Sequence, residues 1–131
     1  MDDCLFCKII SGQIPCHKVY ENEKYFAFLD INPIQEGHIL LIPKKHSDYI
    51  FDLSNKEYAE LFLEAKKIAQ KLKIATNAKR IGVAIEGFAV PHVHIHLVPL
   101  TQGNQLNPLM AKPGDPEILV KIADKIKEEL K

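Results

Sequence analysis

The chain has 131 residues, its 17 basic and 17 acidic side chains cancel to a net charge of zero, and 47% of its residues are apolar. This length fits one compact domain, and the composition excludes low-complexity and wholly disordered chains. The balanced charge gives no bulk positive field to attract a nucleic-acid backbone or an anionic membrane. We therefore expect a single domain over residues 1–131, with no nucleic-acid and no membrane partner.

We expect neither an export signal nor a membrane-spanning segment in this chain. Its apolar runs, such as residues 39–42, are far shorter than the roughly 18 residues that cross a bilayer. The first three residues include two aspartates, whereas a signal peptide begins with basic residues. The three cysteines, Cys4, Cys7 and Cys16, are odd in number and crowd at one end, which disfavours a disulfide framework. These features predict a cytoplasmic protein.

The first half of the chain predicts a short helix followed by strands. Residues 1–16 are expected to hold a helix over Leu5–Ser11 and then an irregular segment that contains a proline. Two β-forming stretches, residues 19–20 and 25–29, flank a polar four-residue segment, which predicts a hairpin. The run 38–42 is apolar on both faces and stops at a proline, as expected for a central strand.

The second half predicts two helices and two more strands. A capping-box sequence, S-N-K-E, opens a helix over about 54–74 whose apolar residues recur every three or four positions. Two strands follow at residues 81–85 and 93–98, and residues 101–131 form a long loop and a C-terminal helix that begins at Asp115. This order predicts an α+β domain: a five-stranded antiparallel sheet with one long helix and a C-terminal helix.

Three histidines stand at alternate positions in the last predicted strand: His92, His94 and His96. Side chains alternate across a strand, so the imidazoles are expected on one face at steps of about 6.8 Å, with the aliphatic residues between them in the core. Such a set favours metal ligation, proton transfer or nucleophilic attack. The pattern leaves open a catalytic metal held by the rings, and a chance polar face on an edge strand.

The segment H-V-H-I-H-L-V at residues 92–98 resembles the motif of the histidine-triad family of nucleotidyl hydrolases and transferases, in its zinc-containing bacterial and archaeal type. Residues 6–10, 28–33 and 37–46 agree with further landmarks of that family, and the resemblance covers roughly residues 4–100. It implies a HIT-like fold, a homodimer and cleavage of an α-phosphorus bond in a nucleoside phosphoramidate or a dinucleoside polyphosphate.

The resemblance also implies roles for four histidines. His94 is the nucleophile, which forms a covalent nucleotidyl-histidine that water then hydrolyses. Its second ring nitrogen is expected to donate to the backbone near His92. His96 donates to the phosphoryl or leaving-group oxygen, and His38 helps to orient His94. Without the family, His38 would be interpreted as a capping residue after a glycine.

By the same resemblance, three residues bind the nucleotide. Phe6 and Ile31 match positions that line the base pocket, and Asp30 matches the acid that binds the ribose. The expected partner is therefore a purine nucleotide or a nucleotide conjugate. From composition and position alone, Phe6 and Ile31 would be interpreted as core residues.

The chain departs from the family where the phosphate is usually contacted. Many members have an asparagine before Glu-Gly, and Gly-Gln-Ser or Gly-Gln-Thr before the triad, whereas this chain has Ile85, Phe88 and Ala89 in that region. Three polar side chains are thereby replaced, although backbone N–H groups of residues 87–89 could still hold a phosphate. The alternative function is a nucleotide-binding or sensing module with little or no turnover.

Cys4 and Cys7 have the C-x-x-C spacing of a zinc chelate that needs two more nitrogen or sulfur donors. The spacing also fits a redox pair or two small buried residues. The resemblance completes the set with His46 and His92, which predicts a structural Zn²⁺ and no organic cofactor. The ion would tie residues 1–16, the N-terminal zinc clip, to the catalytic strand.

Overall fold

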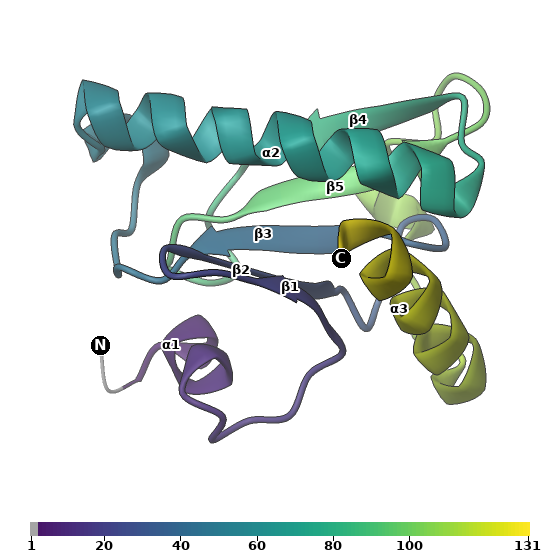
Figure 1. Ribbon diagram of the computed structural model, residues 1–131, viewed down its shortest axis with the longest axis horizontal. Coiled ribbons are helices and arrows are strands. Elements are labelled where there is room, and N and C mark those ends of the chain that lie inside the picture. The colour runs from purple at the N-terminus through teal and green to yellow at the C-terminus, as the bar shows by residue number, and fades with distance from the viewer. Residues whose placement is uncertain (1–2) are drawn as a thin grey trace.

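A computed structural model describes residues 3–131 as an antiparallel sheet covered by helices (Figure 1). Met1 and Asp2, which contribute to the acidic start, lie outside the described residues. The strand order is β1-β2-β3-β5-β4. The strands are Lys18–Glu21 (β1), Tyr25–Leu29 (β2), Ile39–Pro43 (β3), Arg80–Ala84 (β4) and Ile95–Leu100 (β5). The expected α+β class and the five-stranded antiparallel sheet are confirmed.

Helices lie on both faces of the sheet (Figure 1). They are α1 (Leu5–Ile10), η1 (Ile50–Asp52), α2 (Asn55–Thr76), η2 (Pro108–Met110) and α3 (Pro116–Leu130). Helices α2 and α3 share one hydrophobic core with the sheet, and α1 packs on the opposite face. Within residues 3–131, every helix is too short or too polar to cross a membrane.

Each face of the sheet has its own core, and β5 contributes to both. Ile95 and Leu97 are fully buried on the α2 side. His96 lies between them in the chain and faces the α1 side, because successive strand residues point to opposite faces. There it is in register with Leu40 on β3, which in turn is in register with Phe28 on β2. The sheet therefore positions His96 beside the aromatic core under α1.

Local sequence explains where the longer helices begin and end. Ser54 accepts a hydrogen bond from the backbone N–H of Glu57, whose side chain accepts from the backbone N–H of Ser54, so the predicted capping box is confirmed. Helix α2 ends at Thr76, two residues later than expected, and its C-cap Asn77 is in the left-handed region. Asp115 caps α3 as expected, and accepts from the backbone of the first turn.

The predicted strand over residues 93–98 is wrong at its start. Strand β5 begins at residue 95, because the N–H of Val93 donates to the carbonyl of Ser47 at 2.7 Å instead of to a neighbouring strand. His92 lies in a bend before it. Of the three histidines, only His96 is therefore a strand residue, and the first two sit on an irregular entry to the strand.

The connection between β2 and β3 requires a glycine at its end. Gly37 has φ +91°, and a Cβ atom there would lie 2.8 Å from Thr76 Cγ2 and 3.1 Å from Pro99 Cγ. Both the backbone conformation and the close approach exclude a side chain. Gly37 thereby lets the chain pass close to the end of α2 and enter β3 directly after His38.

We predict that Gly37→Ala lowers the free energy of unfolding by about 2–4 kcal/mol, from the left-handed backbone and the steric overlap together. The matched control is Gly12→Ala, because Gly12 has φ +84° with no atom near its absent Cβ. In that variant the free energy of unfolding should fall only by the cost of the left-handed backbone, about 1–2 kcal/mol. Urea unfolding of both variants measures the difference, and equal losses would show that the contact with Thr76 is irrelevant.

Candidate functional site

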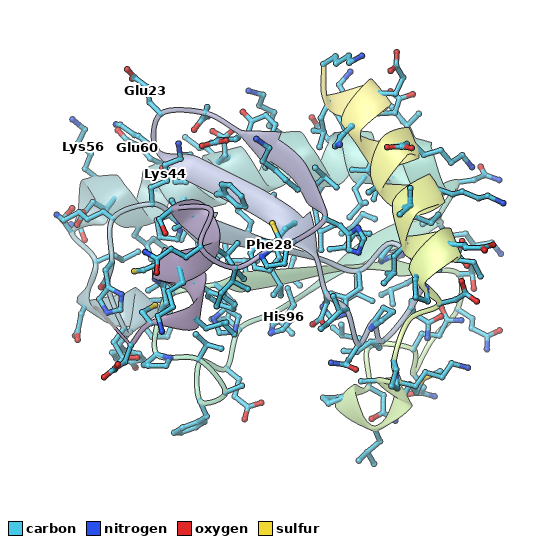
Figure 2. The ribbon with its side chains drawn as sticks, turned by 90° about the horizontal axis from the view of Figure 1, so that it is seen from below. Glu23, Phe28, Lys44, Lys56, Glu60 and His96 are labelled. Carbon is cyan, nitrogen blue, oxygen red and sulfur yellow. The ribbon has the colours of Figure 1, made fainter. Side chains whose placement is uncertain are left out.

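Two groups of polar side chains lie on the α1 side of the sheet, where Figure 2 shows Phe28 and His96. The first group contains the nucleophile candidate and its neighbours: Asp30, His38, His94 and His96. The second group contains the zinc-ligand candidates: Cys4, Cys7, His46 and His92. The structure thus brings together residues that are up to 88 positions apart in the sequence.

His94 is held in a single orientation by the backbone. Its Nδ1 lies 2.7 Å from the carbonyl oxygen of His92, which can only accept, so Nδ1 carries the proton. The Nε2 atom consequently keeps its lone pair. The ring packs edge-on against Phe6 and His96, with 5.0 Å between ring centroids in each case. The contact expected between His94 and the backbone of His92 is present, and it leaves Nε2 in the state that a nucleophile needs.

His38 and His96 form a directional chain of hydrogen bonds. The backbone N–H of Ile34 donates to His38 Nδ1 at 3.0 Å, so the proton of this ring is on Nε2. His38 Nε2 in turn donates to His96 Nδ1 at 2.9 Å. The proton of His96 is therefore on its Nε2. We call this chain of Ile34 N–H, His38 and His96 the histidine relay; it presents one fixed N–H donor at its end.

His38 bonds to His96 and not to His94, so the expected help of His38 in orienting His94 would pass through His96. The antiparallel register explains the difference. Leu40 lies opposite His96, so residue 38 is a diagonal neighbour of residue 96 and is twice as far along the strand from residue 94. His38 therefore reaches the nucleophile candidate only through His96, whose ring packs against it.

Asp30 lies beside the histidine relay without forming an ion pair. One carboxylate oxygen accepts from the backbone N–H of Asn32 at 2.8 Å. The other lies 3.7 Å from His38 Nε2, beyond hydrogen-bond range. Burial lowers the pKa of His38, and the opposing effect of Asp30 is smaller, so the imidazole stays neutral. The side chain of Asp30 is 22% exposed, which leaves this second oxygen available to a ligand.

Burial lowers the pKa of His96 to about 4, and the neighbouring rings of His38 and His94 act in the same direction. The neutral state is the one that the histidine relay requires. A second proton on His96 would occupy Nδ1, the atom that accepts from His38. Protonation of His96 and integrity of the relay are therefore mutually exclusive.

Asp30, His38 and His96 also bring ligand atoms within 4.8 Å of one another. A metal here would need a lone pair on His38 Nε2, whereas the N–H of Ile34 on Nδ1 leaves the proton at Nε2. The polarity of these hydrogen bonds favours proton donation over metal ligation. His92 faces the other group, so the alternative in which all three motif histidines hold one metal has no support in this geometry.

The predicted base-pocket residues differ in exposure. Phe6 is 3% exposed and packs edge-on against Phe28, His92 and His94, so it supports both groups from within the core. Ile31 is 60% exposed, so its interpretation as a core residue is wrong, whereas Phe6 is indeed core. The sequence did not distinguish the two, because both are apolar residues whose surroundings depend on tertiary packing.

A cleft of about 350 Å³ opens at His94, lined by residues 48–51 and 85–88. Phe88 is 89% exposed and Ile85 is 36% exposed, so apolar side chains stand where the family usually has polar ones. Phe51, which no sequence motif indicated, is 67% exposed at the same cleft. The nucleophile candidate is therefore reached through an apolar rim.

The four zinc-ligand candidates converge on one point. His92 Nδ1 lies 3.3 Å from Cys4 Sγ, 3.6 Å from Cys7 Sγ and 3.2 Å from His46 Nδ1, and Cys7 Sγ lies 3.4 Å from His46 Nδ1. A tetrahedral zinc ion with its usual bond lengths separates nitrogen ligands by about 3.3 Å and sulfur from nitrogen by about 3.6 Å. The spacing and the donor types of this cluster both fit zinc.

The backbone also sets the ring of His92 for ligation. Its Nε2 donates to the carbonyl oxygen of Pro43 at 2.8 Å, so the lone pair is on Nδ1, the atom that faces the sulfurs. Cys4 is the N-cap of α1 and accepts from the N–H of Cys7, which places both thiols on the same side of the helix start. The N-terminal segment thereby lies against the segment that contains the motif histidines, residues 92–96.

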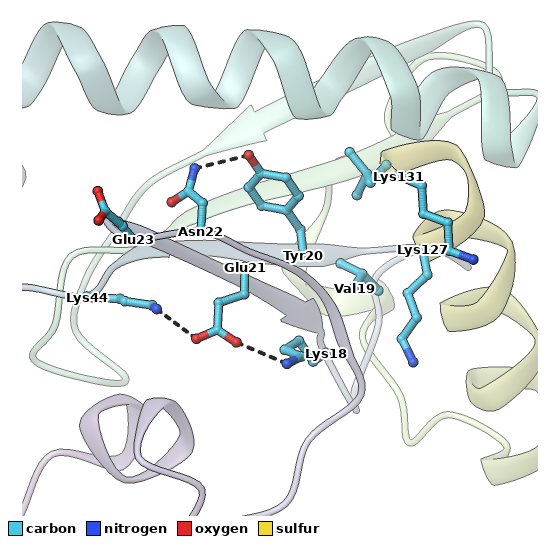
Figure 3. Close-up of a pocket in the computed structure, with 10 residues that line it drawn as sticks. Lys18, Val19, Tyr20, Glu21, Asn22, Glu23, Lys44, Lys127 and Lys131 are labelled. Carbon is cyan, nitrogen blue, oxygen red and sulfur yellow. Dashed lines mark hydrogen bonds and ion pairs between the residues drawn. The ribbon is translucent and has the colours of Figure 1, made fainter.

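An open pocket of about 670 Å³ lies away from both groups, between β1 and α3 (Figure 3). Several lysines line it, but Lys44 and Lys18 pair with Glu21 at 2.7 and 3.0 Å. The charged side chains that line this pocket thus partly pair with one another. None of the residues expected from the sequence to form a site lines this pocket.

The lowered pKa of His96 predicts a pH-dependent stability. Because the unfolded residue titrates near 6.5 and the folded one at about 4, the unfolded chain binds more protons between these values. The stabilising effect is complete above pH 6.5 and is lost as the pH falls toward 4, by at most about 1.4 kcal/mol per pH unit. Urea unfolding at several pH values should show that the free energy of unfolding depends less steeply on pH in His96→Asn than in the wild type. Identical slopes would contradict a neutral, buried His96.

Known proteins are similar to this chain over most of its length. A family model of the HIT domain matches residues 11–103. An uncharacterized HIT-like protein of Borreliella burgdorferi is 38% identical over 122 residues, which cover 82% of this chain and 88% of that protein. An adenosine 5'-monophosphoramidase of Candida albicans is 35% identical over an alignment of 143 positions, covering 97% of this chain and 91% of that protein.

Solved structures give the same result. The crystal structure of a zinc-bound histidine triad family protein from Mycobacterium smegmatis has a TM-score of 0.84 at 28% identity, covering 98% of this chain and 94% of that one. A HIT-like protein from Bartonella henselae has a TM-score of 0.83 at 32% identity and 98% coverage of both chains. With its motif histidines, fold and matched domain, the chain belongs to the histidine triad (HIT) family.

Proposed function

We propose that this protein is a nucleotidyl hydrolase or transferase that uses His94 as its nucleophile. The observation that carries the proposal is the hydrogen bond from His94 Nδ1 to the carbonyl of His92, which leaves the Nε2 lone pair free. Next to this ring, the histidine relay ends in the N–H donor of His96. A nucleophile beside a fixed hydrogen-bond donor is the arrangement that displacement at phosphorus requires.

The reaction would proceed in two displacements. His94 Nε2 forms a bond to the α-phosphorus while the bond from phosphorus to the leaving group breaks, which gives a nucleotidyl-histidine. His96 Nε2 donates a hydrogen bond to the phosphoryl or leaving-group oxygen and stabilises the charge that develops there. Water then attacks the phosphorus, the bond to His94 breaks, and a nucleoside monophosphate leaves.

The proposed substrate is a nucleoside phosphoramidate, and a dinucleoside polyphosphate is the second candidate. The Candida albicans relative is named an adenosine 5'-monophosphoramidase, which supports the first. Asp30 would bind the ribose hydroxyls through its exposed carboxylate oxygen, and the exposed side chain of Ile31 would contact a purine base. Phe6, buried beneath His94, would support the pocket from below.

The alternative is a nucleotide-binding or sensing module with little turnover. One observation favours it: Ile85 and Phe88 line the cleft at His94, so no side chain at these two positions can donate to a phosphate. Backbone N–H groups near Gly87 would then carry the phosphate contact alone. The two functions share the same binding site and differ only in whether His94 forms the covalent intermediate.

We further propose that Cys4, Cys7, His46 and His92 hold a structural zinc ion, which the converging donor atoms support. When bound, the ion would keep both cysteines as thiolates and cross-link α1 to the motif segment. The ring of His92 is already oriented by Pro43, so this residue presents its lone pair without rearrangement. No organic cofactor is part of this proposal.

A homodimer also belongs to the proposal. Strand β4 is at the edge of the sheet, and Val83 on it is 47% exposed. Leu63 and Ile74 on α2 are 66% and 61% exposed. These apolar side chains support pairing of two copies through the sheet edge and the long helix. The cytoplasmic location stays a prediction from the sequence.

We predict that wild-type protein hydrolyses an adenosine phosphoramidate and that His94→Ala lowers kcat by at least about 10³-fold, because the nucleophile is removed. Intact-mass spectrometry after rapid quenching should detect a nucleotidyl adduct in the wild type and none in His94→Ala. His17→Ala is the control, since His17 belongs to neither polar group of the described residues.

The same assay separates the alternatives. Nucleotide binding by calorimetry with no adduct and no turnover, on either substrate class, would reject the enzyme and support the sensing module. Turnover that persists in His94→Ala would reject the proposed nucleophile.

We predict about one zinc ion per chain in the wild type and its loss in Cys7→Ser, because a hydroxyl is a poor ligand for zinc in this set. Cys16→Ser is the matched control, because Cys16 is also a free cysteine but lies outside the cluster. Metal analysis of the proteins, purified under zinc-replete conditions, measures the zinc content of both variants. Equal zinc contents in the two variants would contradict the ligand set.

A further inference from the structure

The loop from residue 31 to residue 37, here called the relay loop, determines the polarity of the histidine relay. Its residue Ile34 provides the N–H that donates to His38 Nδ1 at 3.0 Å. The N–H of His38 in turn donates to the carbonyl of Gln35 at 3.1 Å. A shift of this loop would therefore remove the donor that fixes which nitrogen of His38, and then of His96, carries the proton.

The relay loop contacts a segment that lies beyond the part of the chain matched by the family model. That match ends at residue 103. The N–H of Gly114 donates to the carbonyl of Ile31 at 2.8 Å, and the amide of Gln35 donates to Met110 Sδ at 3.7 Å. Two contacts thus join the beginning and the middle of the relay loop to residues 110–114.

A cavity of about 650 Å³ separates the two segments between these contacts. Its lining includes Ile34, Gln35, Met110, Lys112, Ile118 and Ile122. Because this space is not filled by side chains, close packing does not fix the relay loop on this side. At its other end the loop is held by the close approach of Gly37 to Thr76. Besides the local bond from the N–H of Asn32 to Asp30, the described hydrogen bonds of the relay loop on this side are consequently those that join Ile31 to Gly114 and Gln35 to Met110.

We propose that residues 110–114 position the histidine relay, by holding the relay loop where Ile34 can donate to His38. The inference rests on the proposed function for its catalytic consequence, but the positioning itself concerns the folded chain alone. Gly114 and Met110 are positioning residues, because they act through Ile34 and His38 and touch neither His94 nor His96. Each chain of this protein would thus use its own C-terminal segment to set the proton donor of its active site.

The consequence for the reaction is a lower rate of the chemical step, with substrate binding nearly unchanged. If Ile34 no longer donates, His38 can carry its proton on either nitrogen, and His96 then loses its fixed Nε2–H donor. Misplacement of a catalytic group by about 1 Å can cost on the order of 10²-fold in rate, and a partial loss of one tautomer costs less. We expect about a 10-fold fall in kcat with KM changed by less than about twofold.

The test compares two matched pairs of variants in the zinc-loaded protein. Gly114→Pro removes the N–H that bonds to Ile31, while Gly114→Ala keeps it and adds a Cβ at 3.0–3.1 Å from the side chain of Leu119, which must shift by a few tenths of an ångström. Met110→Ala removes the sulfur contact, while Leu109→Ala changes a neighbour that is 92% exposed. The second pair keeps the test decisive should Gly114→Pro fail to fold.

Two readouts are recorded for each variant: kcat and KM with an adenosine phosphoramidate, and the ¹⁵N shifts of the His96 ring. We expect Gly114→Pro to lower kcat about 10-fold and Met110→Ala about threefold, with His96 changing from one tautomer to a mixture in both. Gly114→Ala and Leu109→Ala should match the wild type. These results together would support the positioning role.

Other outcomes overturn the proposal. A fall in kcat with an unchanged His96 tautomer would show that the segment acts elsewhere, and a rise in KM alone would show that it contacts the substrate. An unchanged tautomer with unchanged kinetics in folded Gly114→Pro or Met110→Ala would show that the contacts are irrelevant. If the wild type turns over no nucleotide, the proposed function fails, while the ¹⁵N shifts still decide the positioning role.

Discussion

One residue, His92, connects the proposed zinc site with the proposed nucleophile through two different atoms. Its ring nitrogen Nδ1 faces Cys4, Cys7 and His46, and its backbone carbonyl accepts a hydrogen bond from His94 Nδ1–H. Both atoms belong to one residue, whose ring is also held by the hydrogen bond from Nε2 to the carbonyl of Pro43. A metal at this cluster would act on the chemistry by position and not by contact with the substrate.

The second constraint is that the backbone sets the tautomers of His92, His94 and His38, and through His38 that of His96. Pro43 fixes His92, the carbonyl of His92 fixes His94, and the N–H of Ile34 fixes His38. Burial then keeps His38 and His96 neutral by lowering their pKa values, so these protons stay where the backbone directs them. A site built in this way depends on loop positions as much as on its four histidines, which explains why segments distant in sequence can influence it.

Much of the fold could be predicted from the sequence because it depends on local rules. The capping box, the apolar runs and the alternation of aliphatic residues all identified elements that the structure confirms. The start of β5 was missed, because the hydrogen bond from Val93 to Ser47 is a tertiary contact with no local signal. The exposure of Ile31 was missed for a similar reason, since an apolar residue after a strand gives no indication of which surface covers it.

The candidate site also divides into features that the sequence predicted and features that depend on tertiary contacts. Spacing and resemblance selected the histidines and cysteines, and the structure gathers them into two groups. The partner of His38 could not be inferred, because it depends on the register between β3 and β5. The contribution of Met110 and Gly114 had no motif at all, since it arises where the end of the chain returns to the loop before β3.

The most direct measurement is the protonation pattern of the His94 ring, read from long-range ¹H–¹⁵N correlation spectra of the zinc-loaded protein, with His94→Gln to assign the signals. We expect the proton on Nδ1, bonded to the carbonyl of His92, and an unprotonated Nε2. A proton found on Nε2 would leave no lone pair directed at phosphorus, and it would contradict the role of His92 as the link between the two groups.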